Sequence, residues 1–444
     1  MTDYEVLVLG GGPAGITIAK TLDGAKDLAV MRPEDHSMVY CAMPYVIEDL
    51  LPMEKTLKED SLVTDTGADL IRDYAVDVDF DEQVVTTGAG DKYGYEELII
   101  ATGASPVLPP VEGTDLDGVT TFKHEEDLNR ILNQVDSEVE EAVVVGAGAI
   151  GIEMSQALNE AGLETHLVDM EESILPHLLD AEMVTEGEEQ LEELGINLHL
   201  GAQIDSLNGT EKVEQVKLAD DETIDFGPQG GLVVFAIGMQ PNVEFVEDSD
   251  LEIGQLGIKV NSKMETNLDN VYAVGDCVEY KSAITDEVTG GNLATNAVPM
   301  GRLLAQNLLG ADREYEGFYN GCATKVNDLF VGGTGLLEKE ATEDYDIVVG
   351  KAEFTTAFPI MPFAKPVKAK LIINRDNLEI LGGQIVSGEP ATDKIDKITM
   401  AIQYGIDAEE LLDFSYSSQP YQSFFPAHNL LVKAAENALS KIEN

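Results

Sequence analysis

Two stretches of the chain share one order of apolar, glycine and helical positions. The first runs from residue 4 to residue 15 (YEVLVLGGGPAG) and the second from residue 141 to residue 151 (EAVVVGAGAIG), and a segment with helical periodicity follows each. A short run in which nearly every residue is apolar is typical of a parallel strand buried on both faces. The pattern therefore predicts two units of strand, glycine turn and helix.

The glycine spacing within both units is G-x-G-x-x-G. The first glycine permits a tight turn, the second lets a pyrophosphate approach the backbone, and the third lets the helix pack on the strand. One such turn is a weak signal, but two in the same context, about 136 residues apart, predict two dinucleotide sites. The glycines are Gly10, Gly12 and Gly15 in the first unit and Gly146, Gly148 and Gly151 in the second.

The pattern changes beyond about residue 315. Strand-like runs (DIVVG, KAKLIIN, EILGGQIV) precede helical segments at residues 392–404 and 427–442, which predicts a separate α+β domain. The last helix is predicted to carry one apolar face, either in the core or at a subunit interface. Its members are Ala427, Leu430, Leu431, Ala434, Ala435 and Ala438.

The 444 residues include 27 basic and 83 acidic ones, which gives a net charge of −56. Nucleic acids and anionic membranes are poor partners for such a surface, because both require basic side chains. The acidic residues are spread along the chain, so we predict a protein from a salt-rich cytoplasm, where high salt screens the self-repulsion. An acidic enzyme adapted to ordinary salt is the alternative.

Cysteine usage and the apolar runs favour a reducing cytoplasm. Cys41, Cys277 and Cys322 are far apart and form no Cys-x-x-Cys, so neither a disulfide framework nor a zinc site is predicted. The chain begins with an apolar strand and carries no secretory pattern, and no apolar run approaches 18 residues. We therefore expect a cytoplasmic protein without a resident metal.

Together with the two glycine turns, residues 101–103 (ATG) and residues 272–279 (YAVGDCVE) give the chain a family resemblance. It resembles the flavin-dependent pyridine nucleotide–disulfide oxidoreductases along nearly its whole length. Residues 40–48 (YCAMPYVIE) are similar to the Cys-x-x-Pro-Tyr segment of the single-cysteine branch, which comprises coenzyme A disulfide reductases, NADH oxidases and sulfur reductases. The resemblance makes Cys41 the redox cysteine; two-cysteine relatives need a second one at the position of Val46.

The resemblance implies an α/β protein with two Rossmann-like domains and a C-terminal α+β dimerisation domain. Residues 1–112 and 244–312 would bind FAD, residues 113–243 would bind the nicotinamide dinucleotide, and residues 313–444 would form a homodimer. The implied FAD contacts are Gly10, Gly12, Pro13, Ala14, Gly15, Ala101, Thr102, Gly103, Gly275, Asp276, Thr295 and Ala297. The implied nicotinamide dinucleotide contacts are Gly146, Gly148, Ile150, Gly151 and Gly238.

Asp169 ends the apolar run THLVD, 23 residues after Gly146. A carboxylate near this position receives the adenosine ribose hydroxyls and repels a 2′-phosphate. The residues that follow are Met170, Glu171 and Glu172, with no arginine. NADH is therefore favoured over NADPH.

The chain departs from the family pattern at the FAD ribose and near the cysteine. Met31 stands where the family has a ribose-binding carboxylate, which leaves Arg32 or Glu34 as substitutes. Pro13 replaces the histidine that streptococcal-type NADH oxidases and peroxidases carry beside the sulfur. Ser37, four residues before Cys41, matches the family and is expected to face the substrate.

The C-terminal region offers further candidate substrate contacts. Tyr416 and Tyr421 stand in place of the Tyr-Ala-Pro-Pro segment of coenzyme A disulfide reductases, and residues 417–425 are a candidate docking loop for a protein partner. The segment AKPVKAK carries Lys365, Lys368 and Lys370, which either meet phosphates of an anionic substrate or form the solvent face of a strand.

Three function classes follow. The first is reduction of a small disulfide or polysulfide by NADH through FAD and Cys41. The second is an NADH oxidase that reduces dioxygen. The third is a flavoprotein reductase or redox sensor for a protein partner. The first is preferred, mainly because Pro13 occupies the histidine position of the peroxide-handling oxidases.

Overall fold

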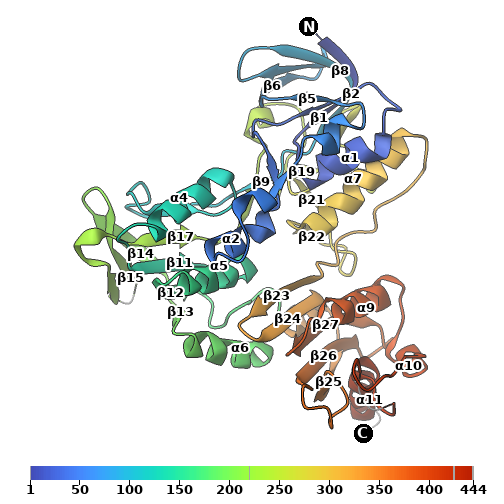
Figure 1. Cartoon of the computed structure of the whole chain (residues 1–444). Coiled ribbons are helices and arrows are strands. Elements are labelled where there is room, and N and C mark those ends of the chain that lie inside the picture. The colour runs from blue at the N-terminus through green and yellow to red at the C-terminus, as the bar shows by residue number, and fades with distance from the viewer. Residues whose placement is uncertain (1, 220, 424–425, 443–444) are drawn as a thin grey trace.

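The computed structural model describes residues 2–219, 221–423 and 426–442. The chain forms three lobes, each built on its own sheet (Figure 1). The first contains the N-terminal residues, the second is built from the middle of the chain, and the third contains the C-terminal residues. Within the described ranges, none of the helices has the length and apolar character that crossing a membrane would require.

The first sheet has seven strands in the order β5-β2-β1-β8-β7-β6, with β20 beside β8. The strands are β1 (Thr2–Leu9), β2 (Leu28–Met31), β5 (Asp69–Ile71), β6 (Ala75–Asp79), β7 (Val84–Thr87), β8 (Lys92–Ile100) and β20 (Val271–Ala273). The strands β5, β2, β1, β8 and β20 are parallel, and the paired segments VLVL of β1, LAVM of β2 and LII of β8 are continuously apolar. The strands β7 and β6 continue the sheet in antiparallel pairs. The strand β20 begins 171 residues after β8 ends, and yet the two strands pair in this sheet. The first lobe is therefore discontinuous in sequence.

Two helices from distant parts of the chain lie side by side under this sheet. They are α1 (Pro13–Leu22) and α7 (Ala294–Leu308). The helix α1 begins at Pro13 directly after the first glycine turn, since proline is well tolerated at the first position of a helix. The shorter elements of this lobe are α3 (Ser61–Thr64), β19 (Ile258–Lys259), β21 (Val278–Lys281) and β22 (Val288–Gly290). The elements β3 (Ser37–Met38), α2 (Met43–Ile47) and β4 (Leu57–Lys58) pack instead on the second lobe, where α2 contacts two helices and Met38 and Leu57 adjoin the core.

The second sheet has five parallel strands in the order β10-β17-β11-β12-β13. They are β10 (Val119–Thr121), β11 (Glu141–Val145), β12 (Glu164–Asp169), β13 (Asn197–Leu200) and β17 (Leu232–Phe235). The helices α4 (Glu125–Val135), α5 (Ala149–Glu160) and α6 (Ala181–Glu193) belong to this lobe, as does the antiparallel meander β14 (Ile204–Gly209), β15 (Val213–Leu218) and β16 (Thr223–Asp225). The strands β9 (Ala104–Pro106) and β18 (Met239–Pro241) pair where the chain crosses between the first two lobes.

The third sheet is antiparallel, with five strands in the order β23-β24-β27-β26-β25. They are β23 (Cys322–Val326), β24 (Leu329–Gly335), β25 (Ile347–Thr355), β26 (Pro366–Asn374) and β27 (Ile380–Ser387). The helix α9 (Thr392–Gln403) packs against β24 and β27, and α11 (Leu430–Ile442) packs against β25 and β26. The predicted fold class, α/β with two Rossmann-like domains and a C-terminal α+β domain, is confirmed.

One helix boundary was predicted wrongly. Ala427 is exposed and precedes α11, which begins at Leu430. The side chain of Asn429 accepts hydrogen bonds from the backbone N–H groups of Leu431 (3.0 Å) and Val432 (3.2 Å). An asparagine that satisfies these N–H groups marks the helix start, so the apolar periodicity extended the helix by about one turn too many.

Candidate active site

The first glycine turn is tight on one side and open on the other. Gly10 has φ +124°, and a Cβ there would lie 2.0 Å from the carbonyl oxygen of Ala101. A Cβ on Gly15 would lie 2.1 Å from the carbonyl oxygen of Gly10. A Cβ on Gly12, in contrast, would meet nothing within 4 Å. The backbone at Gly12 therefore faces open space at the N-terminus of α1, where a phosphate is favoured.

The second glycine turn repeats this arrangement. Gly146 has φ +109°, and a Cβ there would lie 2.5 Å from the carbonyl oxygen of Ala236. A Cβ on Gly151 would lie 1.7 Å from the carbonyl oxygen of Gly146, whereas one on Gly148 would meet nothing within 4 Å. The two predicted dinucleotide turns therefore share one geometry on two separate sheets.

Asp169 lies beside the second turn. Its carboxylate accepts hydrogen bonds from the backbone N–H groups of Ala147 and Glu171, the latter at 2.9 Å. Because Ala147 stands within the turn, the carboxylate at the end of β12 is fixed next to Gly146 and Gly148. Ile150 is 46 % exposed in the first turn of α5, and a Cβ on Gly238 would also meet open space.

Of the two candidates for the FAD ribose, Arg32 lies over the first glycine turn. A Cβ on Gly11 would lie 2.5 Å from Cδ of Arg32, and the guanidinium group pairs with Asp60. The Nε of Arg32 is buried and has no hydrogen-bond partner. Glu34 is exposed, and its carbonyl oxygen accepts a hydrogen bond from Arg72. The orphaned Nε is a donor that a bound ligand would satisfy, because buried N–H groups are rarely left unpaired.

The remaining predicted FAD contacts come together around α1 and α7. A Cβ on Gly275 would contact Ala14 and Ala297, both at 3.6 Å, which brings the starts of the two helices to one point. Thr295 is exposed in the first turn of α7. The hydroxyl of Thr102 donates to the carbonyl oxygen of Asn242 at 2.7 Å. This bond links the predicted flavin-lining segment to the residue that follows β18.

Asp276 faces a lysine that sequence analysis missed. Nζ of Lys123 lies 3.9 Å from its carboxylate, donates to the carbonyl oxygen of Ala104 at 2.5 Å, and lies 5.7 Å from the ring centre of Tyr40. Burial raises the pKa of the Asp276 carboxyl and lowers the pKa of the Lys123 ammonium. No motif identifies Lys123, because its position depends on how the second lobe meets the first.

Cys41 is an exposed thiol at the start of a short helix. It lies in the turn 40–42 that precedes α2, where Pro44 stands in the first turn. Cys277 is buried and donates to the carbonyl oxygens of Val274 (3.3 Å) and Ile100 (3.5 Å), and burial raises its pKa to about 11. Cys322 is half-buried, and burial raises the pKa of its thiol as well. Cys41 is therefore the accessible cysteine.

The two predicted tyrosines lie on the third lobe. The hydroxyl of Tyr416 donates to the carbonyl oxygen of Pro426 at 2.9 Å. Tyr421 is 65 % exposed, and its ring stacks on Phe363 with the ring centres 5.4 Å apart. Within the ranges that the structure covers, neither side chain contacts Cys41. Positions 424 and 425 of the predicted docking loop lie outside the described residues.

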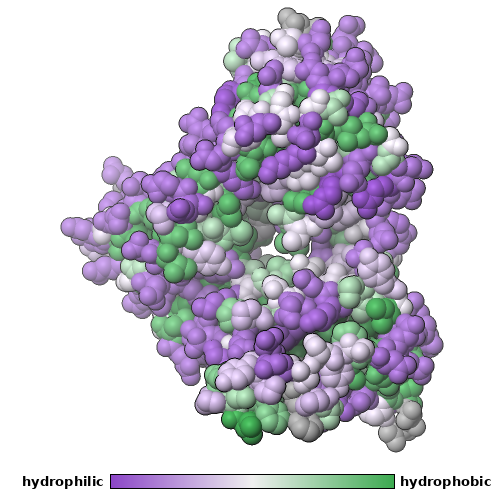
Figure 2. Space-filling model, turned by 45° about the vertical axis from the view of Figure 1, so that its right-hand side comes forward, coloured by the Kyte–Doolittle hydropathy of each residue, from purple (hydrophilic) through white to green (hydrophobic). Residues whose placement is uncertain are grey.

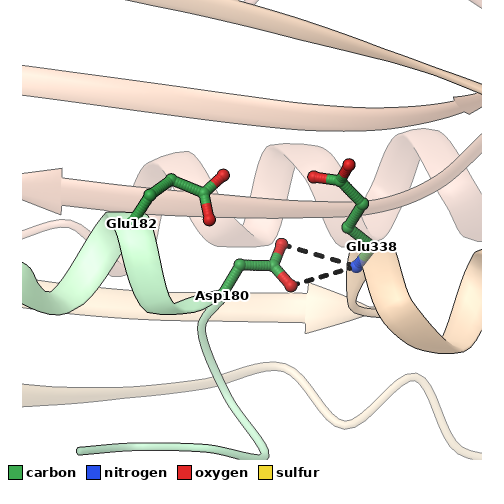
Figure 3. Close-up of side chains that lie close together, drawn as sticks. All are labelled: Asp180, Glu182 and Glu338. Carbon is green, nitrogen blue, oxygen red and sulfur yellow. Dashed lines mark hydrogen bonds between the residues drawn. The ribbon is translucent and has the colours of Figure 1, made fainter. Parts of the chain in front are cut away.

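Two lysines of the AKPVKAK segment form ion pairs within the protein. Lys370 is fully buried, and its ammonium group contacts the carboxylates of Asp180, Glu182 and Glu338. Figure 3 shows these three carboxylates converging from the start of α6 and from the start of α8 (Glu338–Asp344). Lys368 pairs with Glu186 on α6, and Lys365 is exposed. Carboxylates at the starts of α6 and α8 therefore pair with Lys370, and Glu186 of α6 pairs with Lys368. A contact of Lys365 or Lys368 with a substrate stays a prediction.

A cleft of about 260 Å³ opens where the three lobes meet. The second lobe contributes His177 to its lining, the first contributes Thr289, and the third contributes Thr334. Figure 2 shows one face of the molecule hollowed at its centre. The lobes therefore do not close completely on one another.

Two open glycine turns on two separate sheets, a third domain with an antiparallel sheet and one exposed cysteine define an oxidoreductase that binds two nucleotides. Residues 4–301 match the model of the pyridine nucleotide-disulphide oxidoreductases, and residues 322–425 match the dimerisation domain of the same family. The chain belongs to this family. Membership implies FAD and a nicotinamide dinucleotide as cofactors, and the open backbone at Gly12 and Gly148 and the unpaired Nε of Arg32 fit both groups.

The chain is similar to both oxidases and sulfur reductases. It is 35 % identical to an NADH oxidase of Methanocaldococcus jannaschii, over 99 % of this chain and 100 % of that protein. It is 31 % identical to a CoA-dependent NAD(P)H sulfur oxidoreductase of Pyrococcus furiosus, over 94 % and 96 %. Among solved structures, an NAD-dependent persulfide reductase from A. fulgidus matches with a TM-score of 0.93 and 26 % identity, over 100 % of this chain and 84 % of that one.

Proposed function

We propose that this enzyme uses NADH to reduce a small sulfur acceptor, a disulfide or a polysulfide, through Cys41. The observation that carries the proposal is the exposure of this thiol, since Cys277 is buried and Cys322 is half-buried. The sulfur oxidoreductase of P. furiosus and the persulfide reductase of A. fulgidus support the same acceptor class.

Gly12, Arg32 and Asp276 are the residues we assign to FAD. The backbone at Gly12 would take the pyrophosphate, the unpaired Nε of Arg32 would donate to the ribose side, and Asp276 would accept from the ribityl hydroxyls. When bound, FAD supplies the chemistry that accepts a hydride from NADH and delivers two electrons to sulfur. Lys123 holds Asp276 in place through their 3.9 Å contact.

We assign the second turn to NADH. The backbone at Gly148 leaves space for the pyrophosphate, and Asp169 would accept hydrogen bonds from the ribose hydroxyls. A carboxylate held at this position repels the 2′-phosphate of NADPH. NADH is therefore the preferred donor.

Cys41 acts as the nucleophile toward sulfur. Its thiolate attacks one sulfur of the acceptor RS–SR, the S–S bond breaks, and the leaving RS⁻ takes the electron pair and then a proton. Cys41 is left as a mixed disulfide with the other half. Two electrons originating from NADH break that bond, release the second thiol and restore the thiolate.

Dioxygen is the second candidate acceptor, because the M. jannaschii relative is an NADH oxidase. Pro13 argues against a mechanism that depends on a histidine beside the cysteine. For assembly we propose a homodimer, which the match of residues 322–425 to a dimerisation domain supports.

The variant Cys41→Ser tests the acceptor. We expect NADH-dependent turnover of coenzyme A disulfide and polysulfide to fall to background, because serine cannot form the mixed disulfide. Anaerobic bleaching of the flavin by NADH should persist in the same protein. Cys322→Ser is the control, since it removes a thiol of intermediate burial and should retain turnover. Wild type with no activity toward any disulfide or polysulfide, and unchanged oxygen consumption in Cys41→Ser, would favour the oxidase instead.

A further inference from the structure

A small ladder before Cys41 carries two polar groups without partners. The strands β3 and β4 are antiparallel, and Ser37 lies directly opposite Lys58. Residues directly opposite in an antiparallel pair project from the same face. Ser37 is 4 % exposed, and its buried Oγ has no hydrogen-bond partner. The side chain of Lys58 is half-buried and has neither a hydrogen bond nor an ion pair within the described ranges.

The isolation of Lys58 is unusual for this chain, which has 83 acidic residues against 27 basic ones. In the described ranges, every other lysine or arginine that is buried or half-buried contacts a carboxylate. Examples are Arg32 with Asp60, Lys123 with Asp276 and Lys370 with Asp180. An ammonium group that is withdrawn from solvent without an anion is costly, so a missing anion is the simplest account of Lys58.

The ladder leads into the turn that contains Cys41, four residues after Ser37. The residue after β3, Val39, donates its backbone N–H to the carbonyl oxygen of Thr56 at 2.7 Å, which continues the ladder toward the turn that contains Cys41. Burial lowers the pKa of the Lys58 ammonium group, and a negative charge on Cys41 acts in the opposite direction. An ammonium group has donors only, and the unpaired serine hydroxyl is free to donate beside it. Together they are two donors that a bound anion would satisfy.

We propose that Lys58 and Ser37 bind the anionic sulfur chain of a polysulfide while Cys41 reacts with it. This inference rests on the proposed function, because it names the acceptor of that site. The Cys41 thiolate attacks the terminal sulfur and forms a persulfide, and the chain, one sulfur shorter, leaves with the electron pair of the broken S–S bond. Both reactants are negative before the reaction and both products are negative after it. A cation at this position reduces the repulsion in each direction.

Binding is tested first without turnover. The rate of Cys41 alkylation by iodoacetamide is measured in the flavin-loaded enzyme against thiosulfate, a small sulfur anion, at ionic strength fixed with potassium chloride. We expect thiosulfate to slow alkylation in wild type and in Lys58→Arg. In Lys58→Met the concentration needed for half-protection should rise about tenfold or more. Lys55→Met is the matched control, since Lys55 is an exposed lysine three residues away and should leave protection unchanged.

Kinetics then separate anion binding from a general effect on the cysteine. In Lys58→Met we expect KM for tetrasulfide to rise about tenfold with little change in kcat. KM for bis(2-hydroxyethyl) disulfide, which has no charge, should stay at the wild-type value. Lys58→Arg should restore KM for tetrasulfide.

The outcomes separate this inference from the proposed function. Lys58-dependent protection by thiosulfate in an enzyme that reduces no sulfur compound would refute the function and support the anion site. Equal protection in wild type and Lys58→Met, or no protection in either, would refute the anion site. Loss of flavin from Lys58→Met would also refute it, because Lys58 would then hold the cofactor. A rise in KM for the uncharged disulfide that matches the rise for tetrasulfide would refute it too.

Discussion

The ammonium nitrogen of Lys370 lies 2.6 Å from the carboxylate of Asp180 and joins the third lobe to the second. Asp180 directly precedes α6, and Lys370 stands in the middle of β26. The side chain of Gln384 donates to the same carboxylate at 2.6 Å and accepts from the backbone N–H of Asp180 at 3.0 Å. Two further ion pairs join the sheet to α6: Lys351 of β25 contacts Glu182, and Lys368 of β26 contacts Glu186. The acidic face of α6 is therefore matched by lysines of β25 and β26.

Lys370→Met should destabilise the protein strongly. Methionine has a similar length and is apolar, so the change leaves the carboxylates of Asp180, Glu182 and Glu338 converging without their shared cation. Removing one partner of a buried ion pair costs about 3–5 kcal/mol, and we expect a value near the lower end because Glu182 and Glu338 are nearly half exposed to solvent. The measurement is urea unfolding at constant potassium chloride. Lys365→Met, at an exposed position in the same segment, should change the free energy of unfolding by less than about 0.5 kcal/mol.

If Lys370→Met unfolds at the urea concentration of wild type, the ion cluster contributes nothing to stability. The double variant Lys370→Met with Glu338→Gln refines the result. Glutamine removes one of the three unmatched charges, so the double variant should be more stable than Lys370→Met alone.

Acid should weaken the same contact between lobes. Hydrogen bonds from Lys370 and Lys351 lower the pKa of Glu182 to about 2, against an ordinary value of 4.5, although burial opposes the shift. Because the folded-state pKa is lowered, the stabilisation is complete above about pH 4.5 and is lost as the pH falls toward 2. The difference in melting temperature between wild type and Glu182→Gln should therefore shrink over this interval. A difference that stays constant from pH 5 to pH 2.5 would contradict the assignment.

The two open glycines allow each nucleotide site to be tested separately. Gly148 has φ −72° and Gly12 has φ −77°, and a Cβ on either meets nothing within 4 Å, so alanine is compatible with the fold at both positions. A methyl group should nevertheless block the approach of a pyrophosphate. Gly148→Ala should keep FAD and raise KM for NADH about tenfold or more. Gly12→Ala should lose FAD while the second domain stays folded.

Absorbance of the bound flavin and steady-state kinetics check both variants. Gly151→Ala is the contrasting variant, because its Cβ would lie 1.7 Å from the carbonyl oxygen of Gly146 and should destabilise the turn itself. If Gly148→Ala loses FAD, or Gly12→Ala keeps it with altered KM for NADH, the two nucleotides have been assigned to the wrong turns.

The fold class was predictable because its signals are local. An apolar strand, a glycine turn and a helix follow one another within about twenty residues, and the glycines at positions 10 and 146 are required by positive φ and close carbonyl oxygens. The position of Asp169 beside the second turn follows from the same unit. Cys41 could be selected as a candidate for the same reason, since its motif is contiguous in sequence, and its redox role stays a prediction.

The contacts between lobes were not predictable in the same way. Lys370 and Glu182 are 188 residues apart, and a charged residue in a local pattern does not identify its distant partner. The lysines of AKPVKAK therefore looked available for a substrate, and Lys123 went unnoticed beside Asp276. Burial separates such candidates from one another, and a local pattern does not give it. Arg32 is buried over the first glycine turn, whereas Glu34, the other candidate for the FAD ribose, is exposed.

Asp169 should determine the choice between NADH and NADPH. In Asp169→Asn the side chain keeps its shape and loses the negative charge that repels a 2′-phosphate. We expect the ratio of kcat/KM for NADH to kcat/KM for NADPH to fall about tenfold. Glu164→Gln, an exposed acidic position at the start of the same strand, is the control and should leave the ratio unchanged. An unchanged ratio in Asp169→Asn would show that another group selects the nucleotide.

High salt should stabilise the protein, since a net charge of −56 produces strong self-repulsion. The screening length falls from about 10 Å at 0.1 M salt to about 3 Å at 1 M, which removes repulsion between exposed carboxylates. The melting temperature should therefore rise steadily from 0.1 to 2 M potassium chloride. The same series with Lys370→Met separates surface repulsion from the buried cluster, because buried pairs are screened much less. Both proteins should gain stability in parallel, with the deficit of the variant preserved at 2 M. A melting temperature that is flat or falls over this range would refute the salt-rich origin.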